Sequence, residues 1–159
     1  MTISVNRSPT TIPCVKTRTI RQRVTLPAPP DAVYRALAES KGHAAFTGSP
    51  ARIPRKAGGR MTAYGGYISG KVLGLWPGMG LLQTWRTTEW PADCPDSRLE
   101  IRLAPAGKGT RLTMIHSDVP AARAARYADG WRAFYWTPLR RYLRTSKAAA
   151  SSRPRATRR

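Results

Sequence analysis

The feature that most constrains this chain is a long segment near its C-terminus, residues 120–144, in which large apolar side chains recur with helical spacing. At about 100° per residue, these side chains fall within about 100° of arc and form one broad face of a helix. The face comprises Tyr127, Trp131, Phe134, Tyr135, Pro138 and Tyr142. Such a helix has to bury this face against another layer, and Pro138 is expected to kink it.

The layer that can receive this helix is a series of short strands. Residues 17–26 alternate, with Ile20, Gln22, Val24 and Leu26 on one face and arginine and threonine side chains on the other, which is typical of a half-buried strand. Further strands, separated by turn sequences, are predicted at residues 51–54, 60–64, 67–75, 81–90, 98–103 and 111–117. Helices are predicted at residues 31–40, with Asp31 as N-cap, and at residues 42–46. Consecutive strands joined by tight turns favour an antiparallel sheet.

These elements predict a single α+β domain at residues 17–145. An antiparallel sheet would wrap around the long C-terminal helix, an arrangement that often leaves a cavity between the two. We expect residues 1–16 to form a flexible leader. Residues 146–159 are rich in Ala, Ser, Arg and Pro and are expected to form a disordered basic tail.

Four short motifs, in this order and spacing, match one family pattern. They are Phe46-Thr47-Gly48, then Gly58-Gly59-Arg60-Met61 with Gly65-Gly66-Tyr67-Ile68-Ser69-Gly70, then Trp85-Arg86-Thr87-Thr88-Glu89-Trp90-Pro91, and finally Gly130-Trp131 with Tyr135. Over residues 17–144 the chain thereby resembles the C-terminal domain of the activators of the heat-shock protein 90 ATPase. These belong to the START-like (SRPBCC) superfamily. The resemblance implies the helix-grip (START-like, Bet v-type) fold, a curved antiparallel sheet around a long C-terminal helix.

The resemblance also implies three candidate functions. The first is a non-catalytic domain that binds a small hydrophobic ligand between the sheet and the C-terminal helix. The second is a co-chaperone-like protein that contacts a heat-shock protein 90-type ATPase through its sheet surface. The third is an enzyme of the polyketide cyclase or aromatase kind, with His116 or His43 as acid or base.

The candidate ligand-binding side chains are mostly aromatic. Large rings can stack on a flat apolar ligand, while tyrosine hydroxyls and indole N–H groups supply a few polar contacts. The candidates are Phe46, Tyr64, Tyr67, Trp85, Trp90, His116, Trp131, Phe134 and Tyr135. Ordinary core packing is the alternative, and we favour it for Trp85 and Trp131.

The chemistry of an enzyme is only weakly represented. His43 and His116 are the only histidines, and His116 alternates with Asp118 along a predicted strand, so the two could point the same way. A general base held by a carboxylate would have this spacing, but a structural hydrogen-bonded pair would have it too, and we favour the structural interpretation. No H-E-x-x-H or C-x-x-C motif is present, and we expect neither a metal nor a cofactor.

The charge is strongly positive, with 28 Lys and Arg residues against 8 Asp and Glu, and the body remains basic without its tail. Such a surface attracts polyanions without specificity. Because no nucleic-acid-binding motif accompanies it, we expect no specific nucleic-acid partner. No stretch reaches the roughly 20 apolar residues that span a membrane, and the N-terminus lacks a signal-peptide pattern, so we expect a cytoplasmic protein.

Overall fold

The computed structural model describes residues 16–152, and they form a six-stranded antiparallel sheet with helices on one side. The strands are β1 (Thr17–Leu26), β2 (Arg60–Ala63), β3 (Ile68–Trp76), β4 (Gly80–Thr87), β5 (Ser97–Ala106) and β6 (Gly109–Pro120). Two helices, α1 (Pro30–Ala38) and α2 (Ser40–Thr47), follow β1, and a short 3₁₀ turn, η1 (Tyr64–Gly66), joins β2 to β3. The chain ends in three consecutive helical segments, α3 (Ala121–Trp131), η2 (Arg132–Trp136) and α4 (Thr137–Ser152).

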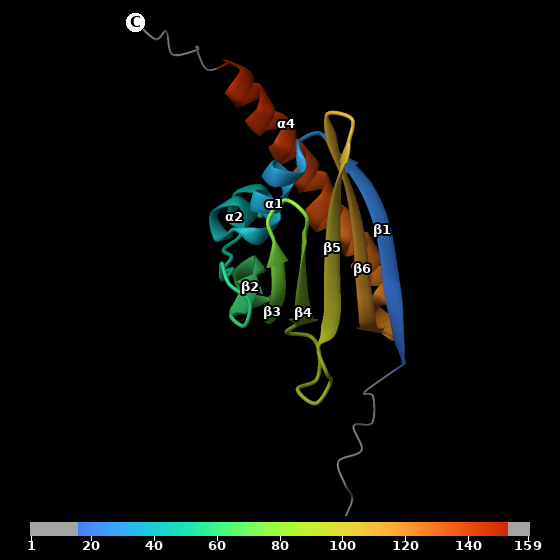
Figure 1. The fold of residues 1–159 in the computed structure, drawn as a ribbon. Coiled ribbons are helices and arrows are strands. Elements are labelled where there is room, and N and C mark those ends of the chain that lie inside the picture. The colour runs from blue at the N-terminus through green and yellow to red at the C-terminus, as the bar shows by residue number, and fades with distance from the viewer. Residues whose placement is uncertain (1–15, 153–159) are drawn as a thin grey trace, which may run out of the picture.

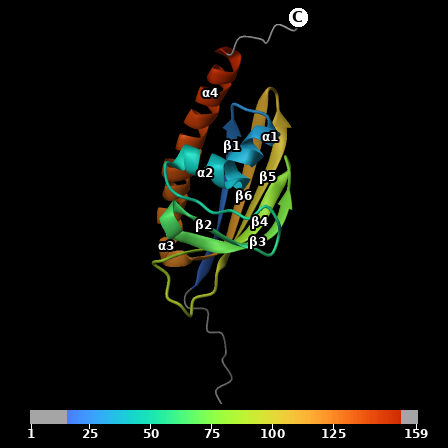
Figure 2. The same ribbon diagram turned by 90° about the vertical axis from the view of Figure 1, so that its left-hand side faces the viewer.

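The sheet has the order β1-β6-β5-β4-β3-β2, so the first strand pairs with the last. In Figure 1 the sheet lies in front and the C-terminal helical segments pass behind it, while Figure 2 shows how the strands curve around them. Register shifts occur between Arg18 and Ile20 in β1 and between Val72 and Gly74 in β3. Such irregularities bend strands locally. The predicted α+β helix-grip fold is therefore confirmed.

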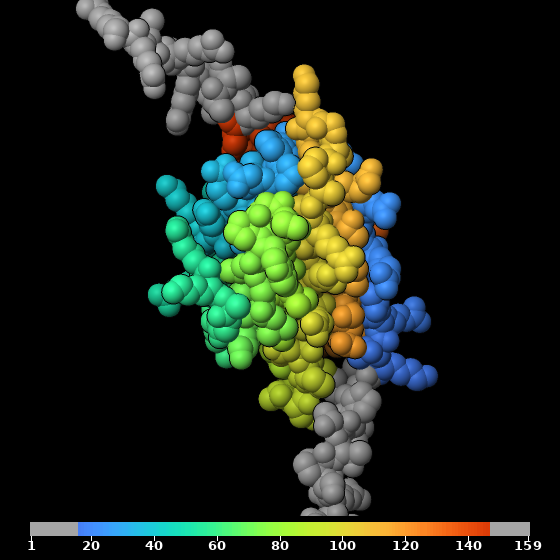
Figure 3. Space-filling model, in the orientation of Figure 1, coloured from blue at the N-terminus to red at the C-terminus, as the bar shows by residue number. Residues whose placement is uncertain are grey.

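The alternation of side chains places one face of each strand in the core. Leu112, Met114 and His116 of β6 are fully buried, while Arg111 points to the outer face. The opposite, outer face of the sheet is formed by β1 and β3–β6 side by side, as the space-filling view shows (Figure 3). Its exposed side chains include Arg21, Arg23, Arg98 and Arg102. The positive charge read from the sequence therefore gathers partly on this face.

The long C-terminal helix is interrupted where Pro138 enters it. Proline has no N–H, so it cannot donate to the carbonyl of Phe134 four residues earlier. Just before it, residues Arg132–Trp136 adopt a π-helical turn, and the Phe134 carbonyl accepts a hydrogen bond from the Tyr64 hydroxyl instead. The distortion predicted at Pro138 therefore takes the form of a π turn, which is one of the recognised causes of a helix bend.

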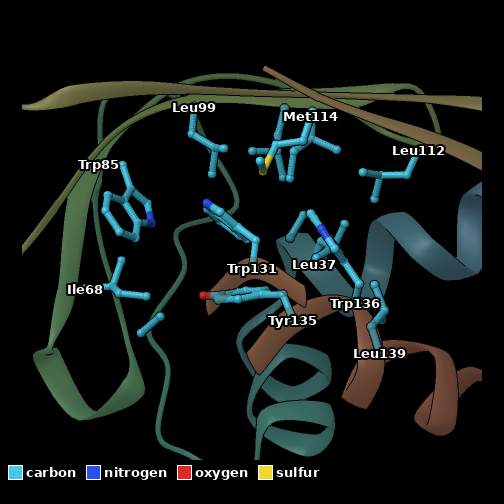
Figure 4. Close-up of a cluster of buried hydrophobic side chains, with 14 of the residues drawn as sticks. Leu37, Ile68, Trp85, Leu99, Leu112, Met114, Trp131, Tyr135, Trp136 and Leu139 are labelled. Carbon is cyan, nitrogen blue, oxygen red and sulfur yellow. The ribbon is translucent and has the colours of Figure 1, made fainter. Parts of the chain in front are cut away.

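Gln22 of β1 holds this interrupted helix to the edge of the sheet. Its amide nitrogen donates to the carbonyl of Ala128 at 2.9 Å, and its amide oxygen accepts from the indole N–H of Trp136 at 2.7 Å. Trp136 in turn stacks on Trp131, with ring centroids 5.4 Å apart and planes 17° apart. The close-up of the core shows both rings beneath the sheet, with Leu139 one turn further on (Figure 4).

Three local predictions differ from the structure. Residues 51–54 form a single bridge between Arg52 and Thr62 and no strand. The first helix begins at Pro30 and has no side-chain cap, and Asp31 lies in its first turn, where it pairs with Arg35 at 3.4 Å. The last helix continues past residue 144 to Ser152, so residues 146–152 of the predicted disordered tail are helical, while residues 1–15 and 153–159 lie outside the described part of the chain. Within the described range, no helix is long and apolar enough to cross a membrane.

We predict that Trp131→Ala lowers the free energy of unfolding by about 3–5 kcal/mol, because a buried indole is lost and a cavity remains. Trp131 is only 4% exposed, whereas Trp76 at the tip of β3 is 50% exposed. The matched Trp76→Ala variant should therefore lose about 1 kcal/mol or less. Urea titrations followed by circular dichroism measure both. Equal losses in the two variants would show that α3 is not anchored through Trp131.

Candidate functional site

A cavity of about 450 Å³ lies between the C-terminal helical segments and strands β3 and β4. It is formed by the first part of β3, the end of β4 with its following turn, and one face of α3 and η2. Its lining residues are Tyr64, Tyr67, Ile68, Trp85, Glu89, Arg126, Tyr127, Gly130, Trp131, Phe134 and Tyr135. This volume falls within the roughly 300–1,000 Å³ of typical small-molecule sites.

The deep part of the cavity is aromatic. Figure 4 shows Trp85 and Ile68 on one side, facing Trp131 and Tyr135 on the other. The rings of Trp131 and Tyr135 lie 4.5 Å apart, and those of Trp85 and Trp131 lie 5.9 Å apart. Burial raises the pKa of the Tyr135 hydroxyl far above its ordinary value, with a further contribution from Tyr64. This wall therefore presents neutral, apolar ring surfaces.

One end of the cavity is polar and centres on Glu89. Its carboxylate accepts hydrogen bonds from Tyr67 at 3.1 Å, Arg123 at 3.1 Å and Arg126 at 3.0 Å, with the Tyr127 hydroxyl at 3.4 Å. Partial burial of the carboxylate would by itself raise the pKa of Glu89. The hydrogen bond from Tyr67 and the positive charges of Arg126 and Arg123 outweigh it, so the pKa is lowered. Glu89 is therefore ionised at neutral pH.

Tyr127 connects this polar end to the core. Its hydroxyl accepts from the indole N–H of Trp90 at 2.7 Å and lies 3.0 Å from the Thr87 hydroxyl. Because Trp90 and Thr87 are both buried, the turn after β4 is held rigidly against α3. That turn carries Glu89, so these contacts position the carboxylate.

The rim of the cavity is formed by Tyr64 and Phe134. Tyr64 has φ of 50°, in the left-handed region that costs a side-chain-bearing residue roughly 1–2 kcal/mol. Its ring contacts both Phe134 and Tyr135, at centroid distances of 6.2 and 5.8 Å. In this strained conformation the Tyr64 hydroxyl donates to the Phe134 carbonyl, and the Tyr64 ring lies at the edge of the cavity.

The structure places six of the nine predicted ligand-binding side chains on the cavity: Tyr64, Tyr67, Trp85, Trp131, Phe134 and Tyr135. The other three lie elsewhere. Phe46 packs on His43 and Tyr135, Trp90 lies behind Tyr127, and His116 is enclosed in the core.

Five lining residues were not among the predicted ligand-binding side chains: Ile68, Glu89, Arg126, Tyr127 and Gly130. Tyr127 belonged to the predicted aromatic face and lies one turn before Trp131, so helical spacing could have found it. Gly130 adjoins that face, and a Cβ added there would meet only the ring of Phe134, at 3.9 Å. Its missing side chain therefore opens space in the cavity and does not serve a close approach to the sheet.

His116 is fully buried among core groups. Its Nδ1 accepts from the indole N–H of Trp131 at 3.1 Å, and its Nε2 lies 2.8 Å from the Ser97 hydroxyl, which itself donates to the Trp85 carbonyl at 2.6 Å. An indole N–H can only donate, so the proton of the neutral imidazole sits on Nε2. Burial lowers the pKa of His116 to about 3. Both nitrogens are thus occupied by core groups.

The side chains of Asp118 and His116 do not point the same way, although their alternation in the sequence allowed for it. Asp118 has φ of 60°, which interrupts the alternation, and its side chain is exposed. Short polar residues such as aspartate tolerate this conformation. The partners of His116 are Ser97 and Trp131 instead.

His43 lies in a second, apolar environment on α2. Its ring contacts Phe46 and Tyr135 at 5.1 and 5.4 Å, and its Nδ1 is buried without a hydrogen-bond partner. It borders a small internal cavity of about 20 Å³ and not the large one. Burial lowers the pKa of His43 to about 4. Within residues 16–152, no group of three or more His, Cys, Asp or Glu side chains is placed to hold a metal.

We predict that His43→Phe makes the free energy of unfolding fall less steeply as the pH is lowered below 7. The unfolded chain takes up a proton at His43 near pH 6.5 but the folded protein only near pH 4, so stability falls as the pH drops through this range. The variant should lose about 3 kcal/mol less than wild type between pH 7 and pH 4. Urea titrations across this range measure the difference. Phe46→Leu, which alters the same cluster without removing a titrating group, should keep the wild-type slope, and parallel profiles for all three proteins would contradict the assignment.

Comparison with known proteins gives relatives in one family. The Activator of 90 kDa heat shock protein ATPase homolog of Dictyostelium discoideum is 29% identical over 132 residues, which are 82% of this chain and 34% of that relative. The chain spans about a third of the length of the curated relatives it matches.

Solved structures share the architecture. CalU16 from Micromonospora echinospora superposes with a TM-score of 0.69 and 25% identity, over 89% of this chain and 85% of that one. An HSP90 activator from Plasmodium falciparum has the same fold, with a TM-score of 0.64 and 17% identity over 85% of this chain and 96% of that one.

The family model described as Activator of Hsp90 ATPase homolog 1-like protein matches residues 27–144, which include α1, α2, β2–β6, α3 and the whole cavity lining. The resemblance inferred from the four sequence motifs is confirmed, and the chain belongs to this family.

Proposed function

We propose that this domain binds a small hydrophobic molecule in the large cavity and performs no chemistry on it. The observation that carries the proposal is the cavity itself: about 450 Å³, walled by Trp85, Trp131 and Tyr135, with polar groups gathered at one end. Apolar walls with a few convergent polar groups are the usual composition of a ligand site.

The contacts of the titrating side chains favour binding over catalysis. A general acid or base needs an atom within hydrogen-bond reach of the reacting group. His116 spends both ring nitrogens on Ser97 and Trp131, and His43 lies away from the large cavity. Glu89 is ionised and already accepts hydrogen bonds from Tyr67 and two arginines. None of these three side chains is therefore placed to exchange a proton with a bound molecule, as the enzyme alternative would require.

We predict that Gly130→Leu blocks the cavity. Gly130 lies within α3, and a Cβ at this position meets only Phe134, so a leucine side chain can extend into the open space without striking the backbone. Binding of the neutral fluorescent probe N-phenylnaphthylamine, followed by its emission, should fall by about tenfold or more, which corresponds to about 1.4 kcal/mol.

Gly130→Ala is the matched control. It adds one methyl group, leaves most of the cavity open and removes a helical glycine, so it should bind the probe and raise stability by about 0.5–1 kcal/mol. Unchanged binding in Gly130→Leu would place the probe elsewhere. The proposed function would be refuted if the wild-type protein did not bind the probe and native mass spectrometry of protein taken from cells showed no bound small molecule.

A second candidate function is contact with a heat-shock protein 90-type ATPase, because the family and several relatives carry that activity in their names. The outer face of the sheet offers exposed arginines, including Arg21, Arg23 and Arg111, that could meet an acidic surface of such a partner.

We predict that, under this alternative, the double reversal Arg21→Glu with Arg23→Glu reduces stimulation of the chaperone ATPase by about tenfold at low salt. Arg141→Glu with Arg144→Glu, two exposed arginines of α4, is the charge-matched control and should retain stimulation. Steady-state ATPase assays with purified chaperone measure both. No stimulation by the wild-type domain would exclude this candidate and leave ligand binding unaffected.

A further inference from the structure

The polar end of the cavity carries a surplus of positive charge. Glu89 is the only acidic residue in the lining of the large cavity, and two arginines pair with it, Arg123 at 3.1 Å and Arg126 at 3.0 Å. One carboxylate neutralises one guanidinium, so this cluster carries a net charge of about +1. Arg126 lines the cavity and Arg123 does not, which puts the uncompensated charge at the cavity itself.

Glu89 is surrounded by donors of the protein. Its Oε2 accepts from Tyr67, Arg123 and Tyr127, and its Oε1 accepts from Arg126. One lone-pair position remains on Oε1, but the two guanidinium groups beside it disfavour the approach of a cation. The lowered pKa of Glu89 keeps it an acceptor throughout the neutral range. Its role is therefore to position Arg126, and it offers no site for a ligand cation.

Arg126 does have capacity. A guanidinium carries five N–H donors, and the bond to Glu89 engages one of them. The side chain is 66% exposed and lines the cavity, so its remaining donors are accessible. A planar fork of donors beside an apolar slot matches a planar oxyanion on an apolar body, because guanidinium and carboxylate pair through two parallel hydrogen bonds.

We infer that the ligand is an aromatic carboxylate, or a closely similar organic monoanion, bound with its flat body against the aromatic lining formed by Trp85 and Trp131 and its anionic group on Arg126. This inference rests on the proposed ligand-binding function and adds the chemical class of the ligand. A phosphate ester fits less well, because a dianion would require more donors than the single guanidinium that lines the cavity provides. A neutral ligand would provide no anionic group for the guanidinium of Arg126 to pair with.

The test compares two probes with the same skeleton, anilinonaphthalene sulfonate and the neutral N-phenylnaphthylamine. Their affinities differ through the anionic group, so their ratio reports its recognition. Wild type should bind the sulfonate about tenfold more tightly, as expected for one charge-assisted hydrogen-bonded pair. This preference should weaken as salt is raised from about 0.01 to 1 M, because the site is partly exposed.

Arg126→Gln should abolish the preference while changing the affinity for the neutral probe less than about twofold. Arg132→Gln is the matched control. It removes the same charge one to two turns along the helix, where Arg132 pairs with Asp129 and lies outside the cavity, so it should keep the preference. Arg132→Gln also measures how much of the sulfonate binding comes from general attraction to the basic surface. Gly130→Leu, which blocks the cavity, measures how much of the binding takes place there.

Equal affinities of wild type for the two probes would overturn the anionic ligand but leave the binding function standing. An unchanged preference in Arg126→Gln, or an equal loss in Arg132→Gln, would also overturn it. Failure of both probes to bind wild type would refute the binding function and this inference with it. Thermal unfolding followed by circular dichroism confirms that each variant is folded before its titration is interpreted.

Discussion

The rest of the structure depends on a chain of hydrogen bonds that ties the C-terminal helix to the sheet. Trp131 donates to His116, His116 donates to Ser97, and Ser97 donates to the backbone carbonyl of Trp85. The chain crosses from α3 through β6 and β5 to β4 in the least exposed part of the molecule. Removing any member would leave a buried polar atom unpaired, at a cost of about 1–3 kcal/mol. Trp131 and Trp85, at its two ends, also line the cavity, so the same bonds support the fold and the site.

Beyond Trp131, the shape of the cavity depends on an interruption of the C-terminal helix. Pro138 removes a donor, residues Arg132–Trp136 form a π turn, and the Tyr64 hydroxyl donates to the Phe134 carbonyl in place of the missing N–H. A regular helix would rotate Phe134 and Tyr135 relative to Trp131, because each residue advances by about 100°. The π turn therefore decides which rings face the cavity. Opposite this rim, Tyr127 and Glu89 hold the turn after β4 against α3, so the polar end is as firmly positioned as the aromatic one.

Periodicity made the fold readable from the sequence. The aromatic face of residues 120–144 and the alternation in β1 predicted which sides of these elements face the core, although Phe134 of the aromatic face is 60% exposed. The alternation placed Gln22 on the buried side but did not predict its hydrogen bonds to Ala128 and Trp136. The partners of His116 could not be read in this way, because Ser97 is 19 residues distant and its meeting with His116 depends on the register of β5 and β6. Asp118 misled because a positive φ interrupts the alternation. Glu89 and Arg126 were not predicted as a pair. Glu89 lies in the turn after β4 and Arg126 lies outside the aromatic face of the helix, and the two meet only because the turn packs against α3.

Two positions that border the cavity, Tyr64 and Gly130, depart from the locally most stable choice. Asp118, the other non-glycine residue described with a positive φ, lies outside the cavity lining and is of a type that tolerates this conformation. Tyr64 adopts a left-handed conformation that glycine would adopt with little strain, and Gly130 occupies a helical position where alanine would be favoured by about 1 kcal/mol. Neither departure is required by the hydrophobic core: an alanine at Gly130 would meet only Phe134 at an ordinary distance. Glycine at position 64, in turn, would lose the ring and hydroxyl at the rim. Natural sequences usually break local rules at functional sites and offset the cost elsewhere. The coincidence of both departures with one cavity is therefore an argument, independent of its volume, for regarding the open space as functional and not as a defect of core packing.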